Sequence, residues 1–516
     1  MSTDLSQITV GIGPLSIEEV VAVARYGATV DIALDALAAV DNTRRRIEDL
    51  ANNPVPVYGV STGFGALARR YVPEELRRQL QRSLVRSHAA GSGPEVETEV
   101  IRALMLLRLS TLCTGRTGVR PVVVETYAQL LNAHITPVVR EYGSLGCSGD
   151  LAPLAHCALA LMGEGIVRCA DGQLYDAADA LAASGIDPLV LQEKEGLALI
   201  NGTDGMLGML CLAIWDLRDL GKVADIATAM TVEGLLGTLT VFDEDLQKLR
   251  PHPGLADSAR NIRTVAADSS ILENAQTEFK QNQVQDAYSV RCAPQVAGGF
   301  RDTLDYCTQV ADRELAAAVD NPVVALDGRV TSNGNFHGAP VAYALDFLAI
   351  VVADLASISE RRTDRFLDTA RNRGLNAFLA DDPGVDSGHM IAQYTQAGIV
   401  SELKRLATPA SVDSIPSSAM QEDHVSMGWS AARKLRRAVD GLARVLAIEI
   451  LTSARAINMR EGTPAVGTGA ALAVVRSRIA PPGVDRYLSP EIEDAVELVV
   501  SGAITEAVEA AVGKLH

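Results

Sequence analysis

Residues 143–150 read Gly-Ser-Leu-Gly-Cys-Ser-Gly-Asp, a glycine-rich turn with a Ser-Gly pair near its end. Because Gly149 has no Cβ, its amide nitrogen can approach the carbonyl carbon of Cys147 closely enough to attack it. Ring closure with loss of water, including the hydroxyl of Ser148, would leave a five-membered ring that carries an exocyclic methylidene. Such a ring is a strong electrophile made from the chain itself. An isolated Ser-Gly pair is more often an ordinary turn, so the interpretation depends on the surrounding sequence.

Composition sets the outer bounds. The chain has 516 residues, of which 48% are hydrophobic and only 4% aromatic, so a globular core must be built from aliphatic side chains. The formal net charge is -18, and we find no concentrated basic face. A nucleic-acid partner is therefore not expected. We expect the short basic run of Arg433, Lys434, Arg436 and Arg437 to lie on a solvated helix face.

Cysteine and histidine spacing argues against disulfides and metals. The seven cysteines are scattered without a CxxC pair, and the eight histidines show no HxxxH spacing. The first residues lack a basic region followed by an apolar run, and the apolar stretch 206–215 is too short to span a bilayer. We expect a cytoplasmic protein with no metal and no membrane partner.

Helical periodicity dominates the chain after Gly205. Apolar residues recur at spacings of three and four in two long stripes. These stripes are Leu345, Leu348, Val352, Leu355 and Ile358, then Leu435, Val439, Leu442, Leu446 and Ile450. Strand signals are short, at 121–124, 323–325 and 329–331. The sequence predicts a mainly α protein. A smaller, loop-rich N-terminal domain covers 1–200, and a long-helix bundle with a C-terminal helical region covers 201–516.

Polar clusters occur in the predicted loops, where functional residues concentrate. Each cluster is weak alone: His88 would more often be structural, and Asn201 could belong to a helix cap. Arg291 suits a carboxylate, which its planar guanidinium can bind in bidentate fashion. In chain order the clusters are Tyr58-Gly-Val-Ser-Thr-Gly-Phe-Gly, Arg86-Ser-His-Ala, Asn201-Gly-Thr-Asp-Gly, Gln285-Asp-Ala-Tyr-Ser-Val-Arg, Asp320-Asn-Pro, Asn333-Gly-Asn-Phe-His-Gly and Met420-Gln-Glu-Asp-His.

Taken together in this order, these motifs are specific. From about residue 10 to residue 460 the chain resembles the ammonia-lyase and aminomutase family that uses 4-methylidene-imidazol-5-one. The resemblance implies a mostly α-helical fold of the fumarase/aspartase-like type, and a homotetramer whose active sites combine residues of three subunits. It also implies that the electrophile forms from Cys147, Ser148 and Gly149. The family triad usually begins with alanine, but the side chain of residue 147 is not part of the reactive ring, so ring formation should survive.

The chemistry explains why such an electrophile is needed. Ammonia elimination from an amino acid removes a scarcely acidic β-proton and expels a poor leaving group, so an electron sink is required. The resemblance implies that the substrate amine adds to the methylidene, and attack by the aromatic ring is the alternative. It makes Tyr58 the base and Arg291 the carboxylate ligand. Asn201 and Tyr288 would position the electrophile and stabilise charge. Gln285, Asn321 and Phe336 would complete the site.

Two positions bear on the substrate. Glu422 could accept an imidazole N–H or act as a base toward the ring, whereas facing a bare phenyl ring it would be left unpaired. His88 can hydrogen-bond an imidazole or a phenol, but Ala89 follows it as in the histidine-specific relatives. These residues predict deamination of L-histidine to trans-urocanate. Residues 268–284 are polar and unlike what the resemblance leads us to expect beside the active-site entrance.

Three other interpretations stay open at this point. A tyrosine or phenylalanine ammonia-lyase or a 2,3-aminomutase would use the same electrophile. A fumarase- or argininosuccinate-type lyase is faintly suggested by the Pro-Ser-Ser-Ala-Met sequence at 416–420. The Gln-Glu-Asp at 421–423 replaces the lysine and asparagine that such enzymes need, and argues against it. The last is a non-enzymatic helical scaffold, which intact-mass measurement would separate, because ring formation removes two waters.

Overall fold

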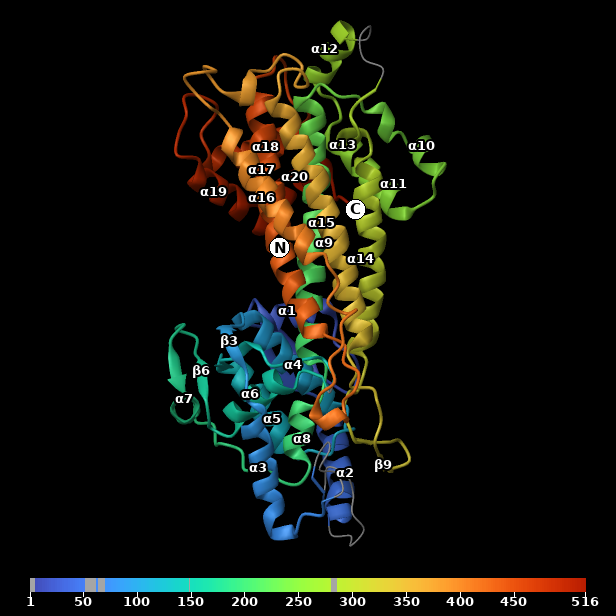
Figure 1. Ribbon diagram of the computed structural model, residues 1–516, viewed down its shortest axis with the longest axis vertical. Coiled ribbons are helices and arrows are strands. Elements are labelled where there is room, and N and C mark those ends of the chain that lie inside the picture. Colours follow the sequence, from blue (N-terminus) through green and yellow to red (C-terminus); the bar gives the residue numbers. More distant parts are fainter. Residues whose placement is uncertain (1–4, 52–61, 64–69, 148, 280–284) are drawn as a thin grey trace.

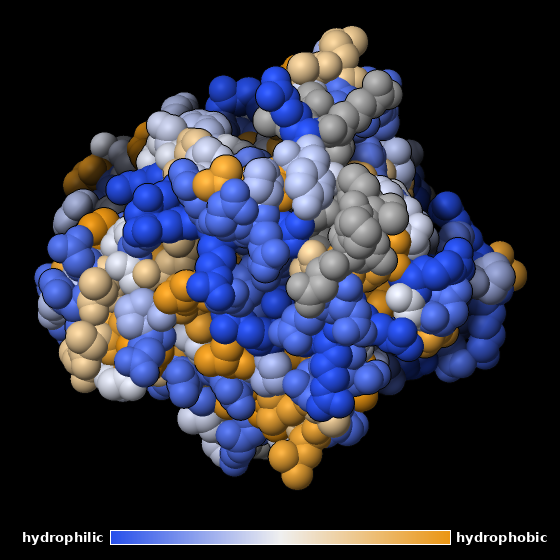
Figure 2. Space-filling view, turned by 90° about the horizontal axis from the view of Figure 1, so that it is seen from below, coloured by the Kyte–Doolittle hydropathy of each residue, from blue (hydrophilic) through white to orange (hydrophobic). Residues whose placement is uncertain are grey.

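A computed structural model describes residues 5–51, 62–63, 70–147, 149–279 and 285–516. The molecule is elongated, with N-terminal segments gathered at the lower end and long helices running from there to the upper end (Figure 1). Seen from below, hydrophilic residues cover much of the lower end, and hydrophobic residues form small separate groups (Figure 2).

Long helices form the body of the protein, as the apolar stripes predicted. α15 packs along α17, and α9 packs against both α17 and α14. The stripe residues from Leu435 to Ile450 are all buried, and so are those from Leu345 to Leu355. The bundle helices are α9 (Asp204–Gly234), α11 (Pro253–Val265), α14 (Ala293–Leu315), α15 (Ala339–Leu367), α16 (Met390–Leu406) and α17 (Gly428–Asn458).

The central helix α9 is apolar because protein surrounds it. Two helical stretches, residues 195–234 and α15, are long and apolar enough to cross a membrane by length and composition. The most apolar window of the first is 100% buried inside the protein, and that of α15 is 61% buried. The hydropathy of α9 thus reflects its central place in the bundle.

The basic run on α17 does not lie on a solvated face, and that expectation was wrong. The side chains of Arg433, Lys434 and Arg436 are only 10%, 19% and 13% exposed, and only Arg437 is open, at 56%. Each cation has an acidic partner on another element. Lys434 Nζ, for example, lies 2.7 Å from Asp346 Oδ1. These ion pairs therefore join α17 to the elements packed against it.

The N-terminal part is more broken. Its helices are α1 (Ile17–Ala24), α2 (Leu34–Ala51), α3 (Arg77–His88), α4 (Thr98–Cys113), α5 (Pro121–Asn132), α6 (Leu151–Leu161), α7 (Ala177–Ala183) and α8 (Glu195–Ile200). Its strands are β1 (Gln7–Val10), β2 (Thr29–Ile32), β3 (Ser92–Glu95), β4 (Thr136–Pro137), β5 (Arg140–Tyr142), β6 (Ile166–Arg168) and β7 (Leu174–Asp176). β1 and β2 pair in parallel, whereas the β3–β5 and β4–β6–β7 pairings are antiparallel.

One strand prediction was wrong and another was confirmed. The Pro-Val-Val-Val sequence at 121–124 begins α5, with Pro121 in the first turn. Proline suits that position because its missing N–H has no helical partner there. The Asp-Gly turn does join two strands, β8 (Val323–Val324) and β9 (Val330–Thr331), with Val323 opposite Thr331.

The remaining helices lie in and around the upper half of the molecule (Figure 1). They are α10 (Glu244–Lys248), α12 (Ser270–Phe279), α13 (Tyr288–Arg291), α18 (Val466–Arg478), α19 (Leu488–Val500) and α20 (Ala503–Val512). Single 3₁₀ turns are η2 (Glu74–Leu76), η3 (Thr240–Phe242), η4 (Ala377–Leu379) and η5 (Ser418–Met420).

Candidate active site

The loop 144–150 is held by a buried carboxylate that follows the triad. Asp150 has no exposed surface, and its Oδ2 accepts the main-chain N–H groups of Gly205 and Met206, each at 2.9 Å. Its Oδ1 accepts the hydroxyl of Ser144 at 2.9 Å. Burial raises the pKa of Asp150 to about 7, although these donors oppose the rise. The loop is therefore fastened to the first turn of α9.

Gly149 occupies a place that only glycine can fill. Its φ is +76°, and a Cβ built there would lie 1.9 Å from the carbonyl oxygen of Gly202. The next residue, Asp150, donates its own N–H to that same oxygen over 2.7 Å. The two backbones are thus in direct contact, whereas the approach of the Gly149 nitrogen to the carbonyl carbon of Cys147 stays a prediction.

Asn201 presents an unpaired polar atom beside this loop. It directly precedes Gly202 and is 3% exposed. Its Nδ2 donates to the main-chain carbonyl of Asn321 over 2.9 Å, but its Oδ1 is buried with no hydrogen-bond partner among the described residues. Buried polar atoms are rarely left unpaired, so Asn201 Oδ1 is suited to receive a donor from a bound molecule.

A second asparagine and a buried ion pair hold Asn201 in place. The side-chain Oδ1 of Asn321 accepts from Ser332 Oγ and from the N–H of Asn333, at 2.9 and 3.0 Å. The preceding residue, Asp320, forms an ion pair of 2.6 Å with Lys194, and both side chains are completely buried. Asn321 therefore acts through its backbone carbonyl, on Asn201.

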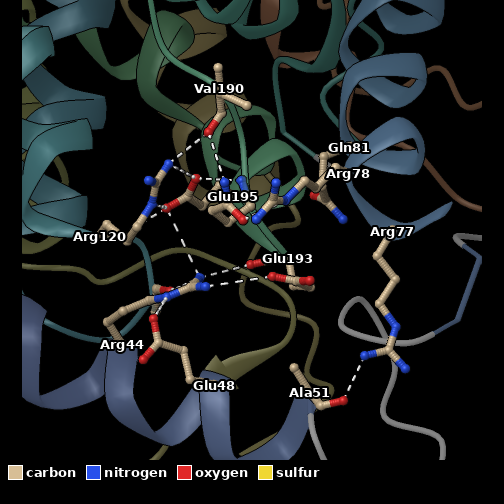
Figure 3. A network of polar contacts seen from close by, with 12 residues as sticks. Arg44, Glu48, Ala51, Arg77, Arg78, Gln81, Arg120, Val190, Glu193 and Glu195 are labelled. Atoms are coloured by element: carbon tan, nitrogen blue, oxygen red, sulfur yellow. Dashed lines mark hydrogen bonds and ion pairs between the residues drawn. The ribbon is translucent and has the colours of Figure 1, made fainter. Parts of the chain in front are cut away.

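The short helix α8 sets the position of Asn201 from the other side. Its first residue, Glu195, is fully buried and accepts from Arg120 Nε at 2.8 Å and Arg120 Nη2 at 2.9 Å. Arg44 approaches the same carboxylate to 4.0 Å and donates to the carbonyl of Glu193 at 3.0 Å. Figure 3 shows these side chains converging on the start of α8. The network fixes the helix that Asn201 directly follows.

Glu422 reaches the first residue of the triad from 275 positions away in the chain. Its Oε2 lies 3.0 Å from Cys147 Sγ and 3.1 Å from Ser417 Oγ. Backbone bonds between Ser417 and Glu422 close the turn that carries the carboxylate. The structure thus brings Glu422 and Cys147 together, which was not evident from their separation in sequence.

The loop that carries Phe336 also contacts the triad loop. Gly338 donates its N–H to the carbonyl of Gly146 over 3.1 Å, and Ser426 Oγ donates to the same oxygen over 2.8 Å. Phe336 itself is half-buried. The next residue, His337, stacks on His424, with ring centroids 5.5 Å apart. Segments 333–338 and 420–428 therefore meet at the loop 144–150.

His88 is the last residue of α3, and the β3–β5 pairing links its segment to the triad loop. Its Nδ1 lies 2.9 Å from the carbonyl oxygen of Leu84. Since a carbonyl only accepts, Nδ1 carries the proton, and in a neutral ring Nε2 is then an acceptor. Ser92 in β3 pairs with Tyr142 in β5, two residues before Ser144. The segment that follows His88 is thus paired with the strand that leads into the triad loop.

The predicted cluster Gln285, Tyr288 and Arg291 is not brought to this loop within one chain. These residues lie on and beside α13 at the upper end of the bundle, whereas α6 and α8 lie at the lower end (Figure 1). The guanidinium carbon of Arg291 lies 4.7 Å from the ring centroid of Tyr288, and Tyr288 is 72% exposed. Arg291 Nε is buried without a hydrogen-bond partner among the described residues.

Buried charges anchor that upper segment. Asp286 is 7% exposed and accepts from Arg373 Nη2 at 2.8 Å and from the N–H of Thr238 at 2.9 Å. Arg362, paired with the fully buried Glu449, donates to the carbonyl of Ser289 over 3.3 Å. The segment is thus rigidly held, although it points Tyr288 toward solvent.

Two predicted site residues, Tyr58 and Ser148, lie outside the described residues, as do 280–284. The sequence reasoning missed Asp150, Lys194 and Asp320. Asp150 and Asp320 adjoin predicted site residues, and each is an acidic residue in a motif of otherwise small or apolar residues. That pattern could have indicated their structural role. No sequence pattern pointed to Lys194. In the part of the chain described here, no group of three or more His, Cys, Asp or Glu side chains could hold a metal ion.

Comparison with known proteins extends over nearly the whole chain. The profile of the aromatic amino acid lyase family matches residues 15–477. The histidine ammonia-lyase of Streptomyces coelicolor is 61% identical over 511 residues, which is 99% of each chain. Among solved structures, the tyrosine aminomutase of Streptomyces globisporus has a TM-score of 0.93 and 36% identity, covering 99% of this chain and 100% of that one. The histidine ammonia-lyase of Trypanosoma cruzi has a TM-score of 0.90 and 36% identity, covering 98% and 96%.

Proposed function

Since the chain belongs to the aromatic amino acid lyase family, a family of carbon–nitrogen lyases, we propose that it converts L-histidine to trans-urocanate and ammonia. The observation that carries the proposal is the contact between Glu422 and Cys147. It puts a carboxylate, the group that would read an imidazole N–H, directly beside the segment that would form the electrophile. The 61% identical relative named histidine ammonia-lyase supports the same substrate.

The residues around the triad fit a 4-methylidene-imidazol-5-one ring formed from Cys147, Ser148 and Gly149. Position 149 accepts only glycine, the residue whose amide the ring would use, since a Cβ there would meet Gly202 at 1.9 Å. Asn201 offers a buried, unpaired oxygen next to Gly202. Once formed, the ring would supply an electrophile that makes the substrate's amino group a better leaving group.

The chain's own side chains divide the remaining work. Arg291 would bind the substrate carboxylate, because its buried Nε–H lacks a partner among the described residues. Tyr288 would lie beside it under the guanidinium. Glu422 would accept the imidazole N–H, and His88 Nε2 would contact the ring or an ordered water. Asn201 would accept from the substrate's ammonium, and Tyr58 would remove the β-proton.

These proposed roles combine residues from distant parts of the chain, so the proposal includes a homotetramer. Helix α13, which ends at Arg291, and helix α6, which begins shortly after the triad, lie at opposite ends of the same chain (Figure 1), so the proposed site would combine chains. An exposed apolar face suits such association. On α14 and α15 it consists of Tyr306 (48% exposed), Tyr343 (47%), Phe347 (43%) and Ile350 (44%).

A direct assay tests the proposal. Purified protein is mixed with L-histidine, and urocanate is followed by its near-ultraviolet absorbance while ammonia is measured separately. We expect turnover by the wild type and none by Ser148→Ala. This variant keeps the two waters that ring formation removes from the wild type, but it lacks the serine oxygen. Its intact mass should therefore exceed that of the processed wild type by two waters less one oxygen. A wild type of unprocessed mass would refute the electrophile, and a processed protein inert toward histidine would refute the substrate.

A second candidate is an aminomutase or lyase acting on tyrosine. It is favoured by the close fold similarity to the tyrosine aminomutase structure, and by His88, whose Nε2 could accept a phenolic hydroxyl as well as an imidazole. Incubation with L-tyrosine and chromatography of the products separates the outcomes. β-Tyrosine indicates a mutase, and coumarate indicates a lyase.

A further inference from the structure

The thiol of Cys147 makes a side-chain contact that the ring chemistry does not use. Ring closure involves only the main-chain carbonyl of residue 147, whereas its Sγ lies 3.0 Å from Glu422 Oε2. Cys147 is 6% exposed and packs with Val425 and Met427. The sulfur is therefore enclosed on its apolar side and points its polar end at the carboxylate.

The contact is a hydrogen bond from the thiol to the carboxylate. A thiolate at this distance would place two negative charges together, so the sulfur carries its proton and donates. Ser417 donates its hydroxyl to the same Oε2 over 3.1 Å. The two donors together restrict rotation of a side chain that otherwise has three free torsions. Both donors engage Oε2, and so they orient the carboxylate that would receive an N–H from a bound imidazole.

Holding the two loops together does not require this bond. Met427 donates its N–H to the carbonyl of Leu145 over 2.9 Å, and Ser426 Oγ donates to that of Gly146 over 2.8 Å. These bonds already join segment 425–428 to the triad loop. The effect of the thiol is therefore local to the orientation of the Glu422 carboxylate.

We propose that Cys147 is a specificity-determining positioning residue, whose thiol aims the Glu422 carboxylate at the ring N–H of the substrate. The inference rests on the proposed function, because it concerns recognition of histidine. It implies a division within one residue: the main chain of Cys147 contributes to the electrophile, and its side chain contributes to substrate choice.

Substitutions at position 147 test the side-chain role. In Cys147→Ala the ring should still form, seen as an intact mass lighter by two waters. The value of kcat/KM for histidine should fall about 3- to 10-fold, the range expected for one weak donor on a charged acceptor. Cys147→Ser supplies a hydroxyl donor and should recover most of that loss. Cys169→Ala, which removes a partly buried thiol elsewhere, should leave kcat/KM unchanged.

A double-mutant cycle identifies the partner. In a Glu422→Ala background, adding Cys147→Ala should cause no further loss on histidine, since there is no carboxylate to orient. Independent, multiplicative losses would overturn the proposal. So would an unchanged kcat/KM in Cys147→Ala while the wild type turns over histidine rapidly, and in that case the proposed function would stand.

A measurement without substrate tests the contact itself. The carboxylate should suppress the thiolate of Cys147, so Glu422→Gln should raise its rate of alkylation by iodoacetamide at least several-fold near neutral pH. Peptide mass spectrometry reports this rate, with Cys169 as the internal reference. Equal rates in wild type and variant would overturn the proposal even if the protein proved inert toward histidine.

Discussion

Asn201 and Asn321 are joined by a single hydrogen bond of 2.9 Å that uses the amide nitrogen of the first and the main-chain carbonyl of the second. This bond fixes which way the Asn201 amide points, and leaves its buried Oδ1 directed away from Asn321 without a partner among the described residues. Lys194 and Asp320 stiffen the acceptor from behind, through an ion pair of 2.6 Å. Asn201 Oδ1 is therefore oriented to accept a hydrogen bond from a bound molecule.

Asn201→Ala should lower kcat/KM for histidine by about 10²- to 10³-fold, the loss typical of one preorganised polar group at a reacting centre. Steady-state kinetics measure this effect. Asn132→Ala is the matched control, because Asn132 exchanges hydrogen bonds of 2.7 and 2.9 Å with the backbone of Val30, away from the loop. It should lower stability and leave kcat/KM intact. Similar kinetic losses in both variants would contradict the role of Asn201.

Gly149→Ala should block ring formation and abolish activity, because its Cβ would collide with the carbonyl of Gly202. The control is Gly172→Ala, which has nearly the same φ (+77° against +76°) but open space around the added carbon. It should cost only the left-handed backbone strain of about 1 kcal/mol. Intact mass distinguishes the two: the control should be lighter by two waters, and Gly149→Ala should not. A processed Gly149→Ala protein would refute the steric argument.

Mixed oligomers should reveal shared active sites. Arg291→Ala and Ser148→Ala should each be inactive alone, because one loses the carboxylate ligand and the other the electrophile. Co-expressed in one cell, the two chains should regain part of the wild-type activity, since some sites would combine an intact Arg291 with an intact triad from another subunit. Two differently tagged chains, purified in tandem, supply the mixed species for assay. Complete inactivity of those oligomers would place both residues in one chain's site.

Breaking the Arg362–Glu449 pair should destabilise the fold and disturb the segment that carries Arg291. Arg362→Met leaves a buried carboxylate unpaired, which should cost about 3–5 kcal/mol of unfolding free energy. The double variant Arg362→Met/Glu449→Leu removes both charges and should recover much of that loss, as urea titration can measure. Arg362 also donates to the carbonyl of Ser289. KM for histidine should therefore stay elevated in the double variant.

His389 should make the protein sensitive to acid. It is 3% exposed, and burial lowers its pKa to about 3, below the ordinary value of 6.5. Between pH 3 and pH 6.5 the unfolded chain binds a proton on His389 that the folded chain excludes. The contribution of neutral His389 to the free energy of unfolding is therefore full above pH 6.5 and is lost as pH falls toward 3. The limiting slope is about 1.4 kcal/mol per pH unit. His389 Nδ1 lies 3.1 Å from Thr452 Oγ1. His389→Asn keeps a polar group that can bond Thr452, and it should flatten the stability curve between pH 4 and 6.

Local features were predictable from the sequence. The stripes ending at Ile358 and Ile450 predicted the long helices, because helical periodicity depends on residues that are close in the sequence. The Asp-Gly hairpin at 327–328 was predictable for the same reason. The Val-Val-Val run after Pro121 was misread as a strand, since β-branched residues favour strands while proline here begins a helix. The basic run on α17 was misplaced because its partners lie on distant elements.

The sequence by itself predicted that Gly149 approaches Cys147, and it determined that the motifs occur in the order of a known lyase family and that the body is helical. All three depend on local sterics, local periodicity or linear order. Only the tertiary structure decided that Glu422 meets the thiol of Cys147 across 275 residues, and that helix α13, which ends at Arg291, lies at the opposite end of the chain. Such spatial relationships depend on how whole helices pack, and that packing is determined by many contacts between residues that are far apart in the sequence.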